Sequence, residues 1–426
     1  MNKKTENKAV SPWQWVPSLY FAQGIPYVVV MSVAVILFKR MGMSNTDIAL
    51  YTSGLNLPWV IKPLWSPLVD LLKTKRWWIV VMQILVGAGL AGIALTIQGP
   101  LAFRYCLAFM WLLAFSSATH DIAADGFYML GLNEKKQAYF VGIRNTFYRF
   151  AVIFGQGILV MFAGWLEQRY AREMPETAAI PQAWSLTFYL LTILFALLFV
   201  YHYLFLPHPR RDTCTLPPQQ ASAGRVFKEF LGTFTSFFQK KHIVSALIFI
   251  LLYRFAEAQL VKITSPFLLD TPATGGLALS TAEVGFIYGT IGVIALTIGG
   301  IVGGIAMARR GLKSCLWTMT IAMNLPNIVY LYLSFARPES IGIISGCVAI
   351  EQFGYGFGFT SLTYFMMLFS NGKHQTAHYA ICTGFMALGL MLPGMISGWI
   401  EESIGYRAFF VWIMLCTIPS FWATHL

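Results

Sequence analysis

Residues 9–38 read AVSPWQWVPSLYFAQGIPYVVVMSVAVILF and contain no charged side chain. A helix needs roughly 20 apolar residues to cross the hydrocarbon core of a bilayer, and this run is longer. Comparable uncharged runs follow at 77–103, 284–308 and 314–336. The 426-residue chain is 57% hydrophobic and 11% charged, whereas about a quarter of the residues of a soluble domain are charged. These runs predict an all-α polytopic protein that lies in the lipid bilayer.

Hydropathy predicts twelve membrane helices in two halves. We place the helices at 12–38, 46–69, 77–97, 101–129, 137–166, 183–206, 242–269, 280–308, 313–335, 340–369, 376–399 and 405–424. The longest interruption, 207–241, contains four prolines and several basic side chains. We therefore expect an N-terminal six-helix half (1–206), a cytoplasmic linker (207–241) and a C-terminal six-helix half (242–426).

The distribution of basic residues predicts the orientation of the chain. With the N-terminus inside, the inner loops hold 18 of the 30 Lys and Arg residues and the outer side holds seven. Basic residues concentrate on the cytoplasmic side of membrane proteins, so both termini are expected to be cytoplasmic. This topology explains the net charge of +12. We expect no nucleic-acid binding, because no soluble domain is present to carry the basic residues.

Charged residues also occur inside two neighbouring predicted spans. Asp121 and Asp125 lie in the fourth span, and Arg144 and Arg149 lie in the fifth. If these spans form an antiparallel hairpin that turns near Glu134, Asp125 is level with Arg144 and Asp121 with Arg149. Charge inside a membrane helix is costly and usually faces a partner or a water-filled path. We interpret the pairs either as a structural salt-bridge network or as a proton-coupling and gating site.

Protonation chemistry defines the candidate coupling residues. Burial raises the pKa of a carboxyl group and a nearby arginine lowers it again, so a carboxylate–arginine pair can exchange a proton as its surroundings change. A histidine can titrate near neutral pH. The candidate coupling and gating residues are His120, Asp121, Asp125, Arg144, Arg149 and Glu257.

Two loops resemble the signature loop of the major facilitator superfamily. Residues 66–76 (SPLVDLLKTKR) end the second helix, and residues 304–313 (GIAMARRGLK) end the eighth. The resemblance implies a 12-helix fold whose two halves are related by pseudo-two-fold symmetry. It also implies that Asp70, Arg309 and Arg310 belong to loops that control conformational change.

The same resemblance implies that helices 1, 4, 7 and 10 line a central cavity. Polar residues are concentrated in these helices, and Arg254, Glu257 and Glu351 fall near the bilayer midplane. Arg254 is planar and permanently charged, which suits a substrate carboxylate or phosphate. Lys62 and Lys262 either extend toward the membrane interface or bind the substrate. The candidate substrate-binding residues are Gln23, Tyr27, Lys62, Arg254, Gln259, Glu351, Gln352 and Tyr355.

Three stretches of the N-terminal half resemble AmpG-type permeases: 21–26 (FAQGIP), 62–70 (KPLWSPLVD) and 115–125 (FSSATHDIAAD). The resemblance implies proton-coupled import of anhydro-muropeptides, GlcNAc-anhydroMurNAc with or without peptide, from periplasm to cytoplasm across the bacterial inner membrane. Related alternatives are a siderophore importer, or an exporter of drugs or other amphiphiles. An enzyme is not expected, because no clustered nucleophile, metal-ligand set or phosphate loop is found. We expect no cofactor, no metal and a monomeric protein.

Overall fold

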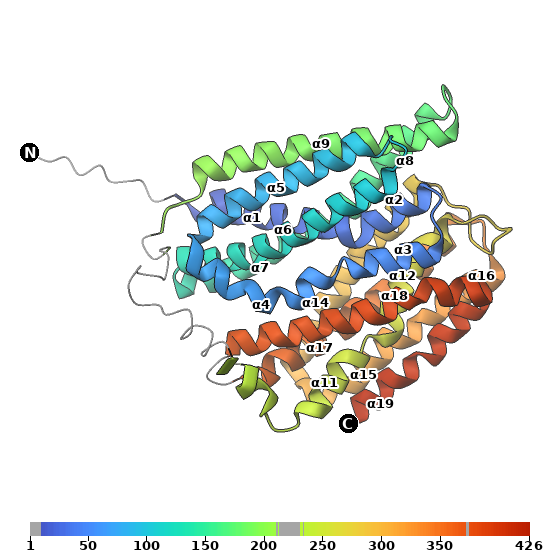
Figure 1. The fold of residues 1–426 in the computed structure, drawn as a ribbon. Coiled ribbons are helices and arrows are strands. Elements are labelled where there is room, and N and C mark those ends of the chain that lie inside the picture. The colour runs from blue at the N-terminus through green and yellow to red at the C-terminus, as the bar shows by residue number, and fades with distance from the viewer. Residues whose placement is uncertain (1–9, 210–211, 213–230, 233, 372–374) are drawn as a thin grey trace, which may run out of the picture.

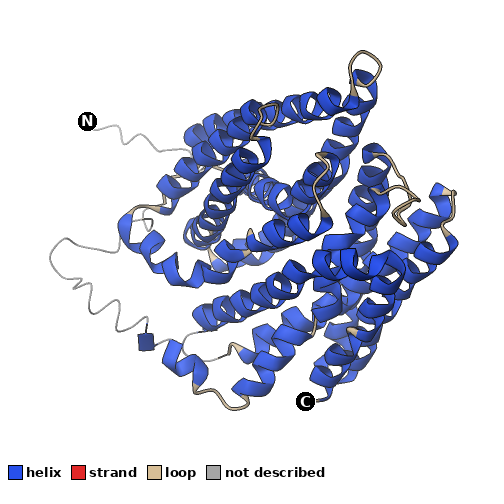
Figure 2. Cartoon of the chain, turned by 45° about the vertical axis from the view of Figure 1, so that its right-hand side comes forward, coloured by secondary structure: helices blue, strands red, loops and turns tan. Residues whose placement is uncertain are grey.

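The protein is a bundle of long helices (Figure 1). The computed structural model describes residues 10–209, 212, 231–232, 234–371 and 375–426, and every regular element in this part of the chain is a helix (Figure 2). Nine of its segments are long and apolar enough to cross a membrane. We call each helix, or run of consecutive helices, that crosses the bundle a column. Two further columns, α3–α4 and α17, lie outside that set, and Gly405 divides the last segment into two columns. The described residues therefore form the twelve predicted columns.

The first six columns occupy the upper part of Figure 1. They are α1 (Pro12–Val28), η1 (Val29–Val33) and α2 (Ala34–Arg40); α3 (Asn45–Gly54) and α4 (Leu57–Leu72); α5 (Lys75–Thr96); α6 (Ala102–Gly131); α7 (Glu134–Val152), η2 (Ile153–Ile158) and α8 (Leu159–Tyr170); and α9 (Glu176–Phe205).

The last six columns occupy the lower part of Figure 1. They are α11 (Ile243–Leu252) and α12 (Phe255–Leu269); α13 (Thr281–Phe286), η3 (Ile287–Gly292) and α14 (Val293–Arg310); α15 (Leu312–Asn324), η4 (Leu325–Asn327) and α16 (Ile328–Ala336); α17 (Ile341–Phe369); and α18 (Gln375–Leu415) with α19 (Thr417–His425). Gly405, with φ of 75°, separates the eleventh column from the twelfth within α18.

Short polar segments separate the apolar runs and determine where helices begin. The Thr74 side chain accepts a hydrogen bond from the Trp77 backbone N–H at the start of α5, and Asn133 caps α7 in the same way. Such caps satisfy donors that a helix N-terminus leaves free. We name the end of the bundle that holds residues 73–74, 133 and 206–209 the linker end, and the end that holds Arg40, Asp270 and Gly405 the far end.

The two sets of six columns meet closely where glycines allow backbone contact. A Cβ atom on Gly289 of η3 would lie 1.9 Å from the Gln156 carbonyl oxygen of η2. A Cβ atom on Gly398 of α18 would lie 2.0 Å from the Asn45 carbonyl oxygen of α3. Small residues permit such approach between membrane helices. The two sets therefore touch through α3 with α18 and through η2 with η3. The proposed boundaries at 206 and 242 stay a prediction.

Candidate functional site

The predicted pair of Asp125 and Arg144 is present in the N-terminal columns. The Arg144 guanidinium lies 3.2 Å from the Asp125 carboxylate. The Tyr20 hydroxyl of α1 joins them, since it accepts from Arg144 at 2.9 Å and donates to Asp125 at 2.9 Å. The guanidinium also lies over the rings of Tyr20 and Tyr128, 4.8 and 5.1 Å from their centroids. Tyr20, which the sequence analysis did not select, is therefore the centre of this group.

The predicted pairing of Asp121 with Arg149 is wrong. Asp121 instead forms an ion pair with Lys62 of α4 at 2.5 Å and accepts a hydrogen bond from the Gln23 side chain of α1. The prediction assumed that α6 and α7 pack directly on each other. In the structure α1 packs against both of them, so a residue of α6 meets α1 and α4 before it meets α7. Arg149 lies within electrostatic range of the Tyr27, Tyr148 and Tyr355 hydroxyls.

A second charged group lies where the seventh column is interrupted. Arg254 has non-helical backbone angles (φ −107°, ψ 20°) between α11 and α12. Its guanidinium lies 2.9 Å from the Glu257 carboxylate, three residues on, and donates to the Tyr355 hydroxyl of α17 at 2.7 Å. It also lies over the ring of Phe359, 5.0 Å from the centroid. Interrupted membrane helices are typical of substrate sites in transporters.

Tyr27 connects the two charged groups. Its ring packs edge-on against the Trp59 ring, with 5.3 Å between the ring centroids, and the centroid of the Tyr148 ring lies 6.4 Å away. Its hydroxyl lies within electrostatic range of Arg254, Glu257 and Asp121. The structure therefore brings together most of the predicted coupling and binding residues. Those residues are Gln23, Tyr27, Lys62, Asp121, Asp125, Arg144, Arg254, Glu257 and Tyr355.

Water reaches the two groups unequally. The Asp125 side chain is 43% exposed and Asp121 22%, whereas Glu257 is 6% exposed. Asp125 lies nearer the linker end of α6 than Asp121 does. The site is therefore more accessible toward the linker end.

Glu351 lies apart from these ion pairs. It is buried, and it accepts hydrogen bonds from the Tyr330 hydroxyl at 3.2 Å and from Gln352 at 2.9 Å. No cation contacts it among the described residues. Gln352 in turn packs beside Gly292 of η3. These two candidates form a hydrogen-bonded group beside α16, separate from Arg254.

Two other candidates point into helix interfaces. The His120 ring lies 3.2 Å from the Gln83 amide, which lies 2.8 Å from His202 of α9. Gln259 accepts from the Trp412 indole at 2.9 Å and contacts the Cys416 thiol at 3.4 Å. The sequence placed both residues on the correct helices. It could not show which way each side chain faces.

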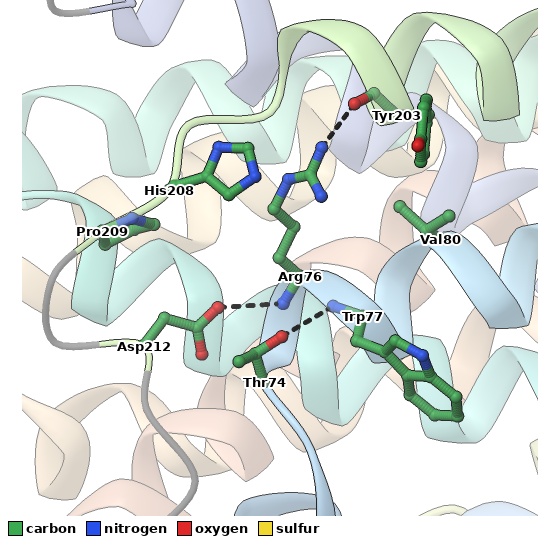
Figure 3. Close-up of a pocket in the computed structure, with 8 residues that line it drawn as sticks. All are labelled: Thr74, Arg76, Trp77, Val80, Tyr203, His208, Pro209 and Asp212. Carbon is green, nitrogen blue, oxygen red and sulfur yellow. Dashed lines mark hydrogen bonds between the residues drawn. The ribbon is translucent and has the colours of Figure 1, made fainter. Parts of the chain in front are cut away.

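The predicted loop residues lie at the linker end. Arg309 and Arg310 are exposed in the last turn of α14, which Gly311 ends with φ of 73°. The Asp70 side chain lies outside the described residues. Figure 3 shows a nearby pocket at the start of α5, where Asp212 accepts from the backbone N–H groups of Lys75 and Arg76. A carboxylate here caps the positive end of the helix.

The far end carries a polar network that sequence reasoning missed. Lys39 lies 2.7 Å from Asp270, which also accepts from the Tyr406 hydroxyl at 2.6 Å. The Asn45 amide donates to Glu401 at 2.6 Å and to Tyr406 at 2.8 Å. We name these five residues the far-end rim. The contacts of Lys39 with Asp270 and of Asn45 with Glu401 and Tyr406 join the first six columns to the last six. The hydrogen bond between Tyr406 and Asp270 holds two of these residues in place.

A neighbouring carboxylate ties the same two sets of columns together. Glu167 of α8 is buried and accepts from Thr281 of α13 at 2.7 Å and from the Trp184 indole at 2.7 Å. Arg40 lies 3.1 Å from it. Glu167 lies at the end of a predicted span, where a carboxylate is unremarkable, so its sequence position gave no signal. The far end is therefore closed by contacts between the two sets.

The residues of the site offer no metal centre. Among the described residues, no three His, Cys, Asp or Glu side chains gather as metal ligands. What they offer is a set of ion pairs lined by tyrosines, inside a bundle of membrane-spanning helices. Such an arrangement can bind a charged solute and can gain or lose protons.

Known proteins resemble this chain in sequence. A transporter of Rickettsia conorii named AmpG is 25% identical over 413 residues, which cover 94% of this chain and 93% of the relative. The anhydromuropeptide permease of Escherichia coli K12 is 24% identical over 409 residues, which cover 94% of this chain and 77% of the permease.

Solved structures and a family match agree with the fold. The nucleoside transporter NupG superposes with a TM-score of 0.69 at 14% identity, covering 97% of this chain and 98% of NupG. A bacterial homologue of the human lysosomal transporter Spinster superposes with a TM-score of 0.67 at 15% identity, covering 96% and 95%. The predicted all-α multi-pass membrane fold is thus confirmed. Residues 18–376 match the Major Facilitator Superfamily, and the chain belongs to that superfamily.

Proposed function

We propose that this chain is a proton-coupled importer of anhydro-muropeptides that works by alternating access. The substrate class is supported by two relatives, an AmpG transporter and an anhydromuropeptide permease, which align over 94% of the chain. Their names describe transporters and not enzymes. The substrate would be the disaccharide GlcNAc-anhydroMurNAc, with or without peptide, whose carboxylates suit a site with buried cations.

The observation that carries the proposal is the Asp121–Lys62 ion pair. Both side chains are 22% exposed, so water reaches a carboxylate and an ammonium that are held 2.5 Å apart within the bundle. Charge at this depth is stable only while it is paired. A proton on Asp121 would leave Lys62 without its partner and free to bind a substrate carboxylate. Proton binding and substrate binding would then favour each other.

The Arg254–Glu257 pair can work in the same way in the C-terminal columns. Glu257 and Tyr355 already satisfy the Arg254 guanidinium. A substrate carboxylate could replace Glu257 if Glu257 took up a proton, since a guanidinium forms bidentate pairs with carboxylates. Asp125, Arg144 and Tyr20 would form the gating group nearer the linker end. We assign Tyr27, between the groups, to contact with the sugar rings.

The orientation follows from the basic residues. With the linker end in the cytoplasm, the loops rich in Lys and Arg lie inside and the far-end rim faces the periplasm. The structure would then be closed on the periplasmic side and accessible from the cytoplasm. We assign the chain to the bacterial inner membrane, with both termini cytoplasmic, and expect a monomer to be sufficient for transport.

Uptake into proteoliposomes tests the proposal. Labelled GlcNAc-anhydroMurNAc, with and without peptide, should accumulate under an imposed inward proton gradient and should not accumulate when a protonophore is present. Uptake that does not depend on the gradient would contradict proton coupling. The absence of uptake by folded protein would contradict the proposed substrate and favour a siderophore importer or an exporter of amphiphiles.

A further inference from the structure

Lys262 is a buried lysine that the ion pairs of the site leave without a carboxylate partner. It lies on α12 and is 2% exposed. Lys62, Arg144 and Arg254 each contact a carboxylate within 4 Å. No hydrogen bond or ion pair to the Lys262 ammonium occurs among the described residues, although it lies in the electrostatic field of Glu257. Glu257 itself is held by Arg254.

The surroundings of Lys262 hold a buried hydroxyl that has no partner in the described part of the chain. A Cβ atom on Gly394 of α18 would lie 2.6 Å from the Ser53 hydroxyl and 3.5 Å from Cγ of Lys262. Both side chains therefore pack against the same glycine, where α3 of the first six columns meets α12 and α18 of the last six. The Ser53 hydroxyl is buried with no hydrogen-bond partner in the described part of the chain. Buried polar groups normally have partners.

The position of Lys262 in the bundle indicates when the side chain can gain a partner. Lys262 lies eight residues before Asp270, which puts it about 12 Å below the far-end rim at 1.5 Å per residue. Any solute that enters from the far end must separate α3 from α12 and α18. That separation breaks the rim and uncovers Lys262 and Ser53 together. A lysine side chain and a hydroxyl donor that are uncovered at the same place can together bind an anion.

We propose that Lys262, with Ser53, binds a carboxylate of the incoming substrate when the bundle is open at its far end. The inference rests on the proposed function, because it names a charged contact for the same substrate. The closed rim then covers this site once the substrate has passed toward Lys62 and Arg254. Lys262 is thus the entry anchor, and the two paired cations take the substrate afterwards.

A comparison of two ligands tests the charge contact. Uptake of GlcNAc-anhydroMurNAc is compared with uptake of its methyl ester, which lacks the carboxylate, in proteoliposomes under saturating proton gradient. The variants are Lys262→Met, Lys262→Gln and Lys262→Arg, with Lys136→Met as the matched control, because Lys136 is exposed at the linker end. Size-exclusion profiles in detergent show which variants fold.

We expect the parent chain to prefer the acid over the ester by at least about tenfold in uptake at low concentration, a typical effect of one charge-assisted hydrogen bond. Lys262→Met and Lys262→Gln should lower this preference several-fold, because only Lys62 and Arg254 then contact the carboxylate. Lys262→Arg should keep most of the preference, and Lys136→Met should keep all of it. A full preference in a folded Lys262→Gln would overturn the entry anchor while the proposed function stands. Transport of neither ligand by the parent chain would contradict the proposed function itself.

Discussion

Lys62 and Asp121 form a 2.5 Å ion pair between α4 and α6, and the Gln23 side chain donates to the same carboxylate. The pair joins the second and fourth columns of the bundle, and α1 supplies the third contact. Two donors stabilise the charged form of a carboxylate, and both interactions weaken when a proton neutralises the carboxylate. A proton on Asp121 would therefore weaken its contacts with Lys62 and Gln23 together.

Asp121→Asn should uncouple transport from the proton gradient. The amide keeps the shape of the side chain but carries no charge and cannot take up a proton. We expect proton-driven accumulation to fall to the equilibrium level, while exchange of labelled for unlabelled substrate continues. Uptake with and without a pH gradient measures this difference.

Glu339→Gln is the matched control for that experiment, because Glu339 is exposed in the loop before α17. It should accumulate substrate like the parent chain. Normal accumulation by Asp121→Asn would remove Asp121 from the coupling role and leave the Lys62 pair as a structural contact.

Arg144→Lys should impair transport even though the charge is kept. A lysine ammonium can contact Asp125, but it lacks the planar guanidinium that lies over Tyr20 and Tyr128 and donates to the Tyr20 hydroxyl. We expect the maximal uptake rate to fall at least about tenfold, consistent with the loss of a charge-assisted bond. Tyr20→Phe should produce a smaller fall in the same direction.

Arg104→Lys is the control, since Arg104 is exposed near the start of α6. Its uptake rate should match that of the parent chain. If Arg144→Lys also retained the parent rate, the stacked geometry would be irrelevant and only the positive charge would count.

Arg254→Ala should weaken substrate binding and leave Glu257 without a partner. We expect the substrate concentration at half-maximal uptake to rise about tenfold or more, because one charge-assisted contact is lost. Arg254→Ala combined with Glu257→Gln should restore folding if the single variant is poorly folded, since the double variant leaves no unpaired carboxylate at position 257. Its half-maximal concentration should remain high; a normal value in the double variant would show that Arg254 is structural.

Local sequence signals predicted the helices well. Hydropathy is a property of each segment, so the predicted ranges differ from the observed columns by only a few residues at most ends. The Asp125–Arg144 pair was also predicted, because hairpin arithmetic gives the height of a residue in the bilayer. The same arithmetic failed for Asp121, since height does not show which helix lies between two others.

The rest of the site depends on contacts that the sequence does not encode locally. His120 and Gln259 lie on predicted cavity helices but face Gln83 and Trp412. The far-end rim joins Lys39 to Asp270 and Asn45 to Glu401, residues that come from different halves of the chain. Such pairs become visible only when the packing of α3 against α18 is known.

The glycine at 398 provides the last test, because it allows the far end to close. A Cβ atom there would lie 2.0 Å from the Asn45 carbonyl oxygen, a distance that no real contact reaches. Gly398→Ala must therefore move α18 away from α3, and the Asn45–Glu401 bond of the rim should be lost with it. We expect a cysteine introduced by Ser53→Cys to react several-fold faster with a membrane-impermeant maleimide added at the far end. Gly346→Ala is the matched control, since a Cβ atom on Gly346 of α17 would meet nothing within 4 Å. Equal labelling rates in the two glycine variants would show that the far end opens without separating α3 from α18.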